Sequence, residues 1–323
     1  MRSLVLKSAT LLSALILAAC AAPPAEKVAR PTLKEMGIHS AGPGSAFLPY
    51  AQGAATYLSA QGLKTVALES GGSVDNLKRV QVETQRTGLV FLGTAFEAVN
   101  ATAPWTEGKK LDNVRALTPM YETSFQLVAL KSAGISTLSE LRGKRVGVGP
   151  AKGPAENFFV GLTDVLRIPF ILVNGTPAAL SADLKAGKID ALWQGASVPI
   201  PAIKDVADTS DAVVFGMTDA EQQSMLGKFP FLSKALVPAA TYKGQSQAIK
   251  SVAGWNFMIA HKDLPDADAY WITRTLLSST DPRTQIHSAA GSTRAENAAN
   301  NTVVPFHPGA LRYYRERGIT SLK

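Results

Sequence analysis

Small residues and backbone amides, rather than charged side chains, are the groups with which this sequence could hold a ligand. Residues 141–157 (LRGKRVGVGPAKGPAEN) contain a short β-type run, a turn rich in glycine and proline, and a helix expected to begin near Pro154. A strand that passes through such a turn into a helix presents backbone N–H groups and the positive end of the helix dipole to an anion. A tight turn without a ligand is the simpler interpretation of this segment taken alone.

Three further turns of this kind follow one another near the N-terminus. SAGPGS (40–45), SGGS (70–73) and GT (93–94) each follow a strand-type run and precede a segment of helical period. We expect Ser73 to cap the helix that follows it. In open α/β sheets such turns meet at the carboxyl ends of the strands, where ligands bind. Their recurrence predicts a binding edge.

The signatures of catalysis and of metal binding are missing from the sequence. GVGPAKG (147–153) fits neither the dinucleotide-binding fingerprint nor the phosphate loop, which disfavours a nucleotide ligand. The four histidines are scattered, and no two of them suit one helix face as metal ligands. His39 follows a predicted strand, but no nucleophile stands near it in the sequence. We therefore expect no enzyme activity, no catalytic residue, no metal and no cofactor.

The elements that must position these turns alternate as in an α/β fold. Strand-type runs occur at 36–40, 65–69, 89–92, 145–149, 170–173, 189–193 and 252–260. Helices are expected to end near Leu58 and to cover 74–83, 154–166, 177–186, a segment from about Pro199, 266–277 and 309–317. Residues 117–130 suit either a strand pair or one strand that crosses between domains, and residues 136–141 a short helix.

Length and composition describe an ordinary globular chain. With 323 residues, 46% hydrophobic and 18% charged, the protein can bury a sizeable core in two domains or one large one. The formal net charge is +8, without a run of basic residues or an aromatic-interleaved basic stretch. This pattern predicts no nucleic-acid partner and a mild attraction for anionic solutes.

The first twenty residues have the features of an export signal. Arg2 and Lys7 precede a short apolar run that ends in LAAC, which resembles the bacterial lipobox with Cys20 as the lipidated residue. We expect a signal peptide at 1–19 and a lipid-anchored tether at 20–32, which places the protein on the periplasmic side of a bacterial membrane. Removing the signal lowers the net charge by two, to +6. An ordinary secretory signal is the alternative, and Cys20 is the only cysteine, so no internal disulfide can form.

Several segments together resemble the TAXI-type solute receptors of tripartite ATP-independent periplasmic (TRAP) transporters. They lie in family order across nearly all of the mature chain: SAGPGS (40–45), GGSVDNL (71–77), LRGKRVGVGP (141–150), LKAGKIDA (184–191), VPIPAI (198–203), KFPF (228–231) and HPGALRYYR (307–315). The second and the last are the most specific of these, whereas the GKRV and GKIDA segments recur in many solute-binding proteins.

The resemblance implies a two-lobed α/β periplasmic solute-binding fold, type II-like, with a ligand cleft between lobes joined by crossing strands. Lobe 1 would comprise 33–123 and 246–323, and lobe 2 would comprise 124–245. The first crossing would fall near 121–130 and the return near 240–252. Such a protein would be a monomer without catalytic activity that captures a small-molecule ligand, glutamate or a related carboxylate, and delivers it to TRAP-type membrane permease subunits.

The resemblance also implies that the ligand site is built from the small-residue turns. The residues carried over are Ser40, Gly42, Gly44, Ser45, Phe47, Gly72, Ser73, Asn76, Gly93, Thr94, Tyr121, Gly153, Asn157, Trp193 and Gln194. The chain departs from the family at Phe47, where tyrosines are common, and in the segment 85–93, so we expect a ligand less polar than glutamate or different in shape. A bulky residue in place of Gly153 is expected to abolish ligand binding without unfolding the protein.

Several of these residues have simpler interpretations. Gly72 suits a tight turn, Trp193 suits core packing, and Asn76 and Asn157 suit helix caps or solvent-facing positions. Two other functions also remain open. A sensor lipoprotein would use the same fold to report a solute to a signalling partner, and an exported enzyme would need a base and a nucleophile that converge in the cleft.

Overall fold

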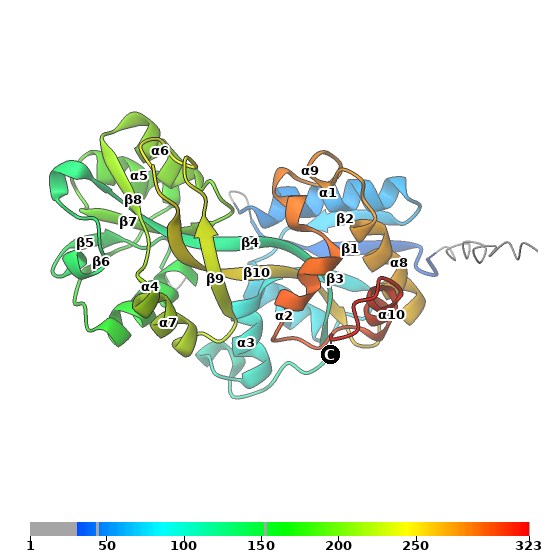
Figure 1. Ribbon diagram of the computed structural model, residues 1–323. Coiled ribbons are helices and arrows are strands. Elements are labelled where there is room, and N and C mark those ends of the chain that lie inside the picture. Colours follow the sequence, from blue (N-terminus) through cyan, green and yellow to red (C-terminus); the bar gives the residue numbers. More distant parts are fainter. Residues whose placement is uncertain (1–30, 43–44, 152–153, 323) are drawn as a thin grey trace, which may run out of the picture.

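The chain folds into two lobes joined by two long strands (Figure 1). The computed structural model describes residues 31–42, 45–151 and 154–322, and one sheet of ten strands runs through both lobes. The strands lie in the order β2-β1-β3-β10-β4-β7-β5-β6, while β8 pairs with β4 and β9 pairs with β10. The connecting strands are β4 (Val114–Leu130) and β10 (Ile249–His261), which pair in antiparallel orientation.

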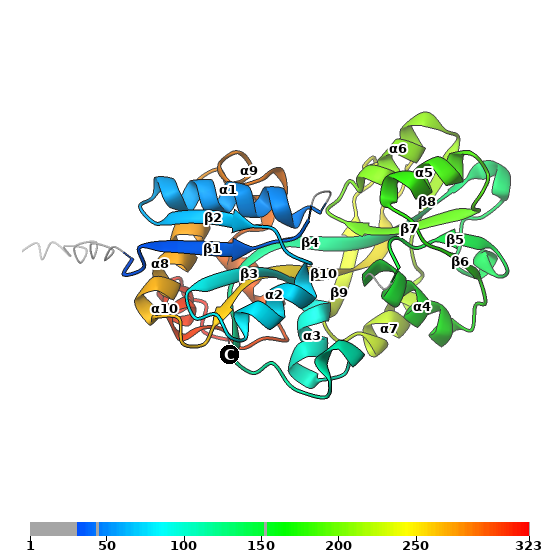
Figure 2. The ribbon, with the colours of Figure 1, turned by 180° about the vertical axis from the view of Figure 1, so that it is seen from behind.

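Lobe 1 contains both ends of the described chain. Its strands are β1 (Glu35–His39), β2 (Lys64–Leu68) and β3 (Arg86–Phe91), and β1 pairs in parallel with the other two. Figures 1 and 2 show α1 on one side of these strands and α2 on the other. Its helices are α1 (Phe47–Ala60), α2 (Ser73–Val80), α3 (Leu92–Asn100), α8 (Asp266–Leu277), α9 (Pro282–Gln285) and α10 (Pro308–Glu316).

Lobe 2 is formed by the middle of the chain. Its short strand β5 (Arg145–Gly147) pairs in parallel with β6 (Ile171–Val173) and with β7 (Ala191–Ala196), and β7 runs antiparallel to β4. Its remaining elements are α4 (Pro154–Leu166), α5 (Pro177–Lys185), α6 (Pro201–Thr209), β8 (Ala212–Phe215), α7 (Asp219–Lys228) and β9 (Leu232–Val237).

Local sequence signals explain where these helices begin. Thr218 caps α7 through a capping box, in which its side chain accepts a hydrogen bond from the Glu221 amide and Glu221 bonds back to the Thr218 amide. Thr176 caps α5, since its side chain accepts a hydrogen bond from the Ala179 amide. In α6 the buried residues Ile203, Val206 and Ala207 form one stripe along the helix, so this helix packs against the sheet along a single face.

Three apolar clusters stabilise the molecule. The largest lies in lobe 1 and includes Tyr50, Leu89, Phe257 and Tyr314. The other two lie on opposite faces of the lobe 2 sheet, one beneath α4 and α7 and the other beneath α5 and α6. The cluster beneath α4 and α7 also contains Phe91 from the end of β3, so it extends across the lobe junction.

Most of the predicted elements are present, with α8 at the predicted bounds. Residues 114–130 form one crossing strand rather than a strand pair, because β4 pairs with β10 in its first half and with β7 and β8 in its second. The return strand β10 begins inside the expected 240–252 and runs on to His261. The short helix expected at 136–141 is a 3-10 helix over Ser139–Leu141. The cap of α2 was predicted wrongly, because Gly72, not Ser73, is its N-cap.

Residues 1–20, which include Cys20, lie outside the described part of the chain, as do Gly44 and Gly153. Between residues 31 and 322, no described helix has the length and apolar character that a membrane span requires.

Candidate ligand site at the lobe junction

The first predicted turn follows β1 at the edge of lobe 1. The backbone N–H and the hydroxyl of Ser40 both donate to the carbonyl oxygen of Leu68, at 2.9 and 2.8 Å, so this turn is tied to the end of β2. Ser45 accepts a hydrogen bond from the Phe47 amide at 3.2 Å at the start of α1. Gly42 is partly exposed, and Phe47 is buried against the lobe 1 core. The described ends of this turn are therefore anchored on both sides.

Asn76 connects two of the predicted turns to strand β3. Its amide nitrogen donates to the carbonyl oxygens of Ser40 and Leu89, each at 2.7 Å, and its amide oxygen accepts from the Ser70 hydroxyl at 2.6 Å. The side chain has no exposed surface, and both donor hydrogens of its amide are used. Asn76 thus holds the ends of β1 and β3 and the start of α2 in one arrangement.

Ser73 and Gly72 also link neighbouring turns. Gly72 has φ of +86°, a conformation that a side chain would strain, and its amide donates to the Ser70 hydroxyl at 3.1 Å. The Ser73 hydroxyl accepts from the Phe91 amide at 3.1 Å, and this bond to the end of β3 takes the place of the expected helix cap. Gly93 and Thr94 follow at the start of α3, where both are buried.

The predicted turn of lobe 2 leaves β5 at Gly147 and reaches Gly149 with φ of +86°. The carbonyl oxygen of Gly149 accepts from the Gly175 amide and from the Asn174 side chain, both at 3.1 Å. These bonds fix the turn against the loop that follows β6. Asn157 lies one turn into α4, where it is exposed.

Gln194 is the predicted site residue with the most distinctive environment. It is 4% exposed, and its amide nitrogen is buried without a hydrogen-bond partner. This nitrogen lies beside the lobe 2 turn, since a Cβ atom built on Gly149 would be 3.5 Å from it. A buried donor without an acceptor costs about 1–3 kcal/mol, so an acceptor delivered to this position would bind favourably.

The neighbours of Gln194 on the same face of the sheet form a bonded network. Gln126 lies opposite it on β4 and accepts from the Tyr242 hydroxyl at 2.5 Å, and the same hydroxyl oxygen accepts from the Ile200 amide at 2.8 Å. Burial raises the pKa of Tyr242 to about 12, so it stays protonated and donates at neutral pH. The network anchors the start of α6 to the crossing strand.

Trp193 lies on the other face of β7, because successive side chains of a strand point to opposite sides. It is fully buried, its indole N–H donates to the Ala155 carbonyl oxygen at 2.9 Å, and its ring stacks on Phe125 with centroids 5.5 Å apart. These contacts are those of a core residue that braces α4. Because Trp193 is the residue next to Gln194 on β7, its packing fixes the strand that carries Gln194.

Phenylalanine rings fill the lobe junction on this second face. The ring centroids of Phe91 and Phe158 are 5.5 Å apart, and those of Phe96 and Phe231 are 5.4 Å apart. Each of these two pairs joins lobe 1 to lobe 2. We call this group the aromatic cluster; it consists of Phe91, Phe96, Phe125, Phe158, Phe229 and Phe231. Gly93 lies against it, and a Cβ atom there would be 2.5 to 2.9 Å from three of the rings. A site residue predicted from the turn pattern therefore packs against this cluster.

Two more residues at the junction bear on its electrostatics. Tyr121 on β4 is buried 5.7 Å from Tyr50, and burial raises its pKa well above the usual value, so its hydroxyl stays neutral. Glu122, the next residue, is partly buried opposite Trp255 without a charged or hydrogen-bonding partner among the described residues. Burial raises the pKa of Glu122, since the charged form is poorly solvated there. The burial of Glu122 was not predicted from the sequence.

Sequence reasoning missed Gln126, Tyr242 and the aromatic cluster. Gln126 and Tyr242 are separated by 116 positions, and the phenylalanines follow no helical or strand period. Among the described residues, no group of histidine, cysteine, aspartate or glutamate is arranged to hold a metal ion. The arrangement can bind a small molecule through backbone amides and the buried amide donor of Gln194.

Comparison with known proteins places the chain. The model of the NMT1-like family matches residues 38–318. MatC from Rhodopseudomonas palustris with bound malate is similar, with a TM-score of 0.53, 15% identity, and 89% of this chain and 97% of that chain covered. A second R. palustris protein, with adipate, has a TM-score of 0.54 and 15% identity, with 90% of this chain and 98% of that chain covered. A TctC solute-binding protein from Polaromonas without ligand has a TM-score of 0.54 and 11% identity, with 89% of this chain and 99% of that chain covered. These likenesses show the fold, that of two-lobed periplasmic binding proteins.

Proposed function

This chain belongs to the NMT1-like family, and we propose that it captures a small organic anion outside the cytoplasm and delivers it to a membrane permease. The observation that carries this proposal is the buried, unpartnered amide of Gln194 beside the Gly149 turn, at the junction of two lobes. A carboxylate oxygen is the acceptor that would complete this donor, with the backbone amides of the neighbouring turns adding further hydrogen bonds.

The ligand class we propose is a small carboxylate, glutamate-like or less polar. Two proteins of similar fold were solved with malate and with adipate, both of which carry two carboxylates. The mature chain's moderate positive charge favours the approach of such anions.

The predicted site residues divide into two roles in this proposal. Gln194 and the backbone of the turns at 40–45, 72–73, 93–94 and 149–153 would contact the ligand. Asn76 would hold the lobe 1 turns in place, as its hydrogen bonds indicate, and Trp193 would back the site from the core. The lobes would comprise 33–123 with 246–323 and 124–245, and would close on the ligand about β4 and β10.

We further propose that the protein is a lipoprotein anchored through Cys20 on the periplasmic side of the membrane, and that its permease is of the TRAP type. The LAAC sequence and the family-order segments from SAGPGS to HPGALRYYR support these two assignments. A sensor that reports the same ligand to a signalling partner is the second candidate. Adjacent genes for large permease subunits would favour transport, and an adjacent histidine kinase gene would favour sensing.

A thermal-shift screen of the purified mature protein tests the binding function. The panel consists of C4 to C8 dicarboxylates, amino acids and aromatic acids, each in excess. A ligand that binds only the native state must raise the melting temperature, by the equivalent of about 2.7 kcal/mol at a hundredfold excess over Kd. We expect at least one carboxylate to do so. If none of the solutes raises the melting temperature, the proposed function fails.

A further inference from the structure

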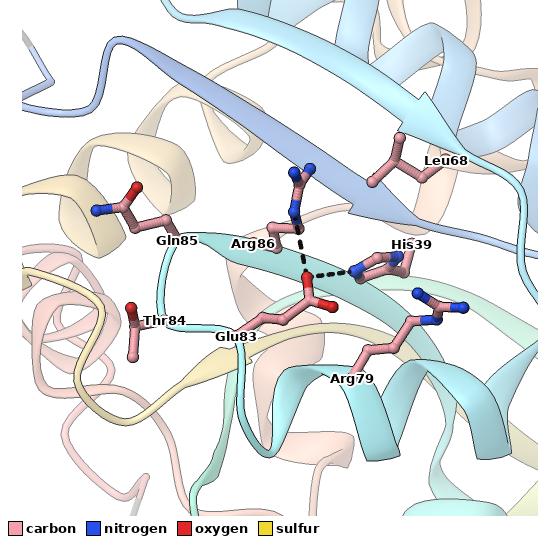
Figure 3. A pocket seen from close by; sticks show the side chains of 7 residues that line it. All are labelled: His39, Leu68, Arg79, Glu83, Thr84, Gln85 and Arg86. Carbon is pink, nitrogen blue, oxygen red and sulfur yellow. Dashed lines mark hydrogen bonds and ion pairs between the residues drawn. The ribbon is translucent and has the colours of Figure 1, made fainter.

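Lobe 1 carries a hollow of about 550 Å³, which none of the predicted site residues lines (Figure 3). It lies where the end of β1, the end of β2 and the turn between α2 and β3 meet. Two arginines, Arg79 and Arg86, contribute to its wall together with His39, Glu83 and Leu68. Two guanidinium groups that share one hollow repel each other unless carboxylates or an anion offset their charge.

Arg86 is held in a fixed position over the sheet. Its Nε lies 3.1 Å from the Glu83 carboxylate, and its guanidinium lies across Gly37, where a Cβ atom would be 2.2 Å from Nη1. Only glycine at position 37 leaves room for this placement. The contact engages the Nε edge, and no hydrogen bond of the two terminal Nη groups to a described residue is formed.

Glu83 also contacts a histidine. The oxygen that faces Arg86 also lies 2.9 Å from the Nε2 atom of His39, which is 3% exposed at the end of β1. The chain from His39 through Glu83 to Arg86 fixes the guanidinium in the same manner as a bonded network fixes a binding residue. Glu83 contacts the Nε edge of Arg86, so the terminal Nη donors of this guanidinium stay directed away from the carboxylate.

Arg79 repeats this arrangement from α2. Its Nε lies 3.0 Å from Asp75, a carboxylate that also accepts from the Gly71 amide at 3.1 Å. Those bonds, the Gly71 amide first and the Arg79 side chain after it, hold the pKa of Asp75 below its usual value, so Asp75 remains charged. The two arginine side chains are 45% and 44% exposed, and Figure 3 shows their guanidinium groups on either side of the His39 ring.

From this geometry we propose that the hollow binds a small oxyanion of the phosphate or sulfate class. Each arginine spends its Nε on a protein carboxylate and keeps its two Nη groups for a ligand. A tetrahedral oxyanion can accept several N–H donors at once, and planar guanidinium groups match its geometry better than ammonium groups do. The site is separate from the carboxylate site at the lobe junction, and this proposal does not depend on that function.

The hollow is also connected to the first turn of the lobe junction. His39 immediately precedes Ser40, and Leu68 both lines the hollow and accepts the two hydrogen bonds of Ser40. Occupancy by an oxyanion would therefore restrain the strand ends from which the junction turn begins.

Isothermal titration of the mature protein with inorganic phosphate and with sulfate tests the proposal. We expect binding with a Kd of about 1 mM or tighter, and a loss of about tenfold or more in Arg86→Gln and in Arg79→Gln. Arg317→Gln is the matched control, since it removes the same charge from an exposed position at the end of α10. Arg86→Lys should recover only part of the affinity, because it keeps the charge but not the planar fork.

The outcomes are decisive in both directions. Absence of phosphate and sulfate binding by the wild-type protein overturns the proposal, as does an equal loss in the Arg317→Gln control, which would indicate general charge attraction. Melting temperatures of all variants identify any that fail to fold, and Arg79→Gln, on the exposed side of α2, is the variant least coupled to the sheet. The carboxylate screen tests the lobe junction separately, so a negative result for one site does not contradict the proposal for the other.

Discussion

Trp193 and Gln194 are neighbours on one strand, yet they face two opposite environments at the lobe junction. On the side of Trp193 the aromatic cluster fills the space between the lobes, and the indole N–H has its partner. On the side of Gln194 the neighbouring Gln126 and Tyr242 carry polar groups, and one amide donor is left without an acceptor. The difference indicates that the aromatic side holds the lobes together and the polar side receives the ligand.

The largest effect is expected on the aromatic side. Phe158→Ala removes the ring that contacts Phe91, Phe125, Phe229 and Phe231, and loss of a buried phenylalanine lowers the free energy of unfolding by about 3–5 kcal/mol. Urea denaturation measures this change. Phe158→Leu, which keeps most of the volume, should lose much less. A loss below about 1 kcal/mol for Phe158→Ala would mean that the rings do not stabilise the junction.

A smaller loss is expected at the polar links of lobe 1. Asn76→Ala leaves the buried carbonyl oxygens of Ser40 and Leu89 without their donors, at a cost of about 1–3 kcal/mol. It should also weaken ligand binding, because the turns lose their common anchor. Asn100→Ala, which removes an exposed amide bonded within α3, is the control. Equal stability of the Asn76 and Asn100 variants would remove Asn76 from its positioning role.

The third effect depends on pH. Burial raises the folded-state pKa of Glu122 above its unfolded value, so folding favours the protonated form. Ionisation of Glu122 therefore destabilises the protein as pH rises through the ordinary glutamate pKa toward the raised one, and this cost persists at neutral pH. Glu122→Gln should be the more stable protein at pH 7, with the difference vanishing well below pH 4.5. Chemical denaturation across this range measures it, and a pH-independent difference would contradict the assignment.

The sequence was informative where its signals are local. Strand-type runs ending in small residues located β1, β2 and β3 and the turns after them, and capping and periodicity located α5 and α8. The run at 117–130 could not be resolved into one strand or two, because pairing with β7 and β10 is decided by distant segments. The elements β8, α7 and β9 were not predicted, since β8 and β9 are short apolar runs and α7 carries few apolar residues.

The sequence predicted candidate residues for the site, but not which contacts they make. Gln194 was named through family resemblance, but the position of its amide nitrogen beside Gly149, which lies 45 positions earlier, was not predictable. The partner of His39 is Glu83, at a separation of 44 positions, so no local pattern could reveal it. Ser73 looked like a helix cap, yet the amide of Phe91 competes for its hydroxyl. Each of these contacts arises from strand order, which a local pattern does not specify.

The measurement that tests the central claim most directly is a calorimetric titration of Gln194→Leu with the carboxylate that raises the wild-type melting temperature most. We expect affinity to fall by about tenfold or more. The free energy of unfolding without ligand should not fall, because an unpartnered buried amide nitrogen contributes no hydrogen bond to lose. Gln223→Leu, at an exposed position on α7, serves as the control. Unchanged affinity in Gln194→Leu, or a loss of stability without a loss of binding, would contradict the account.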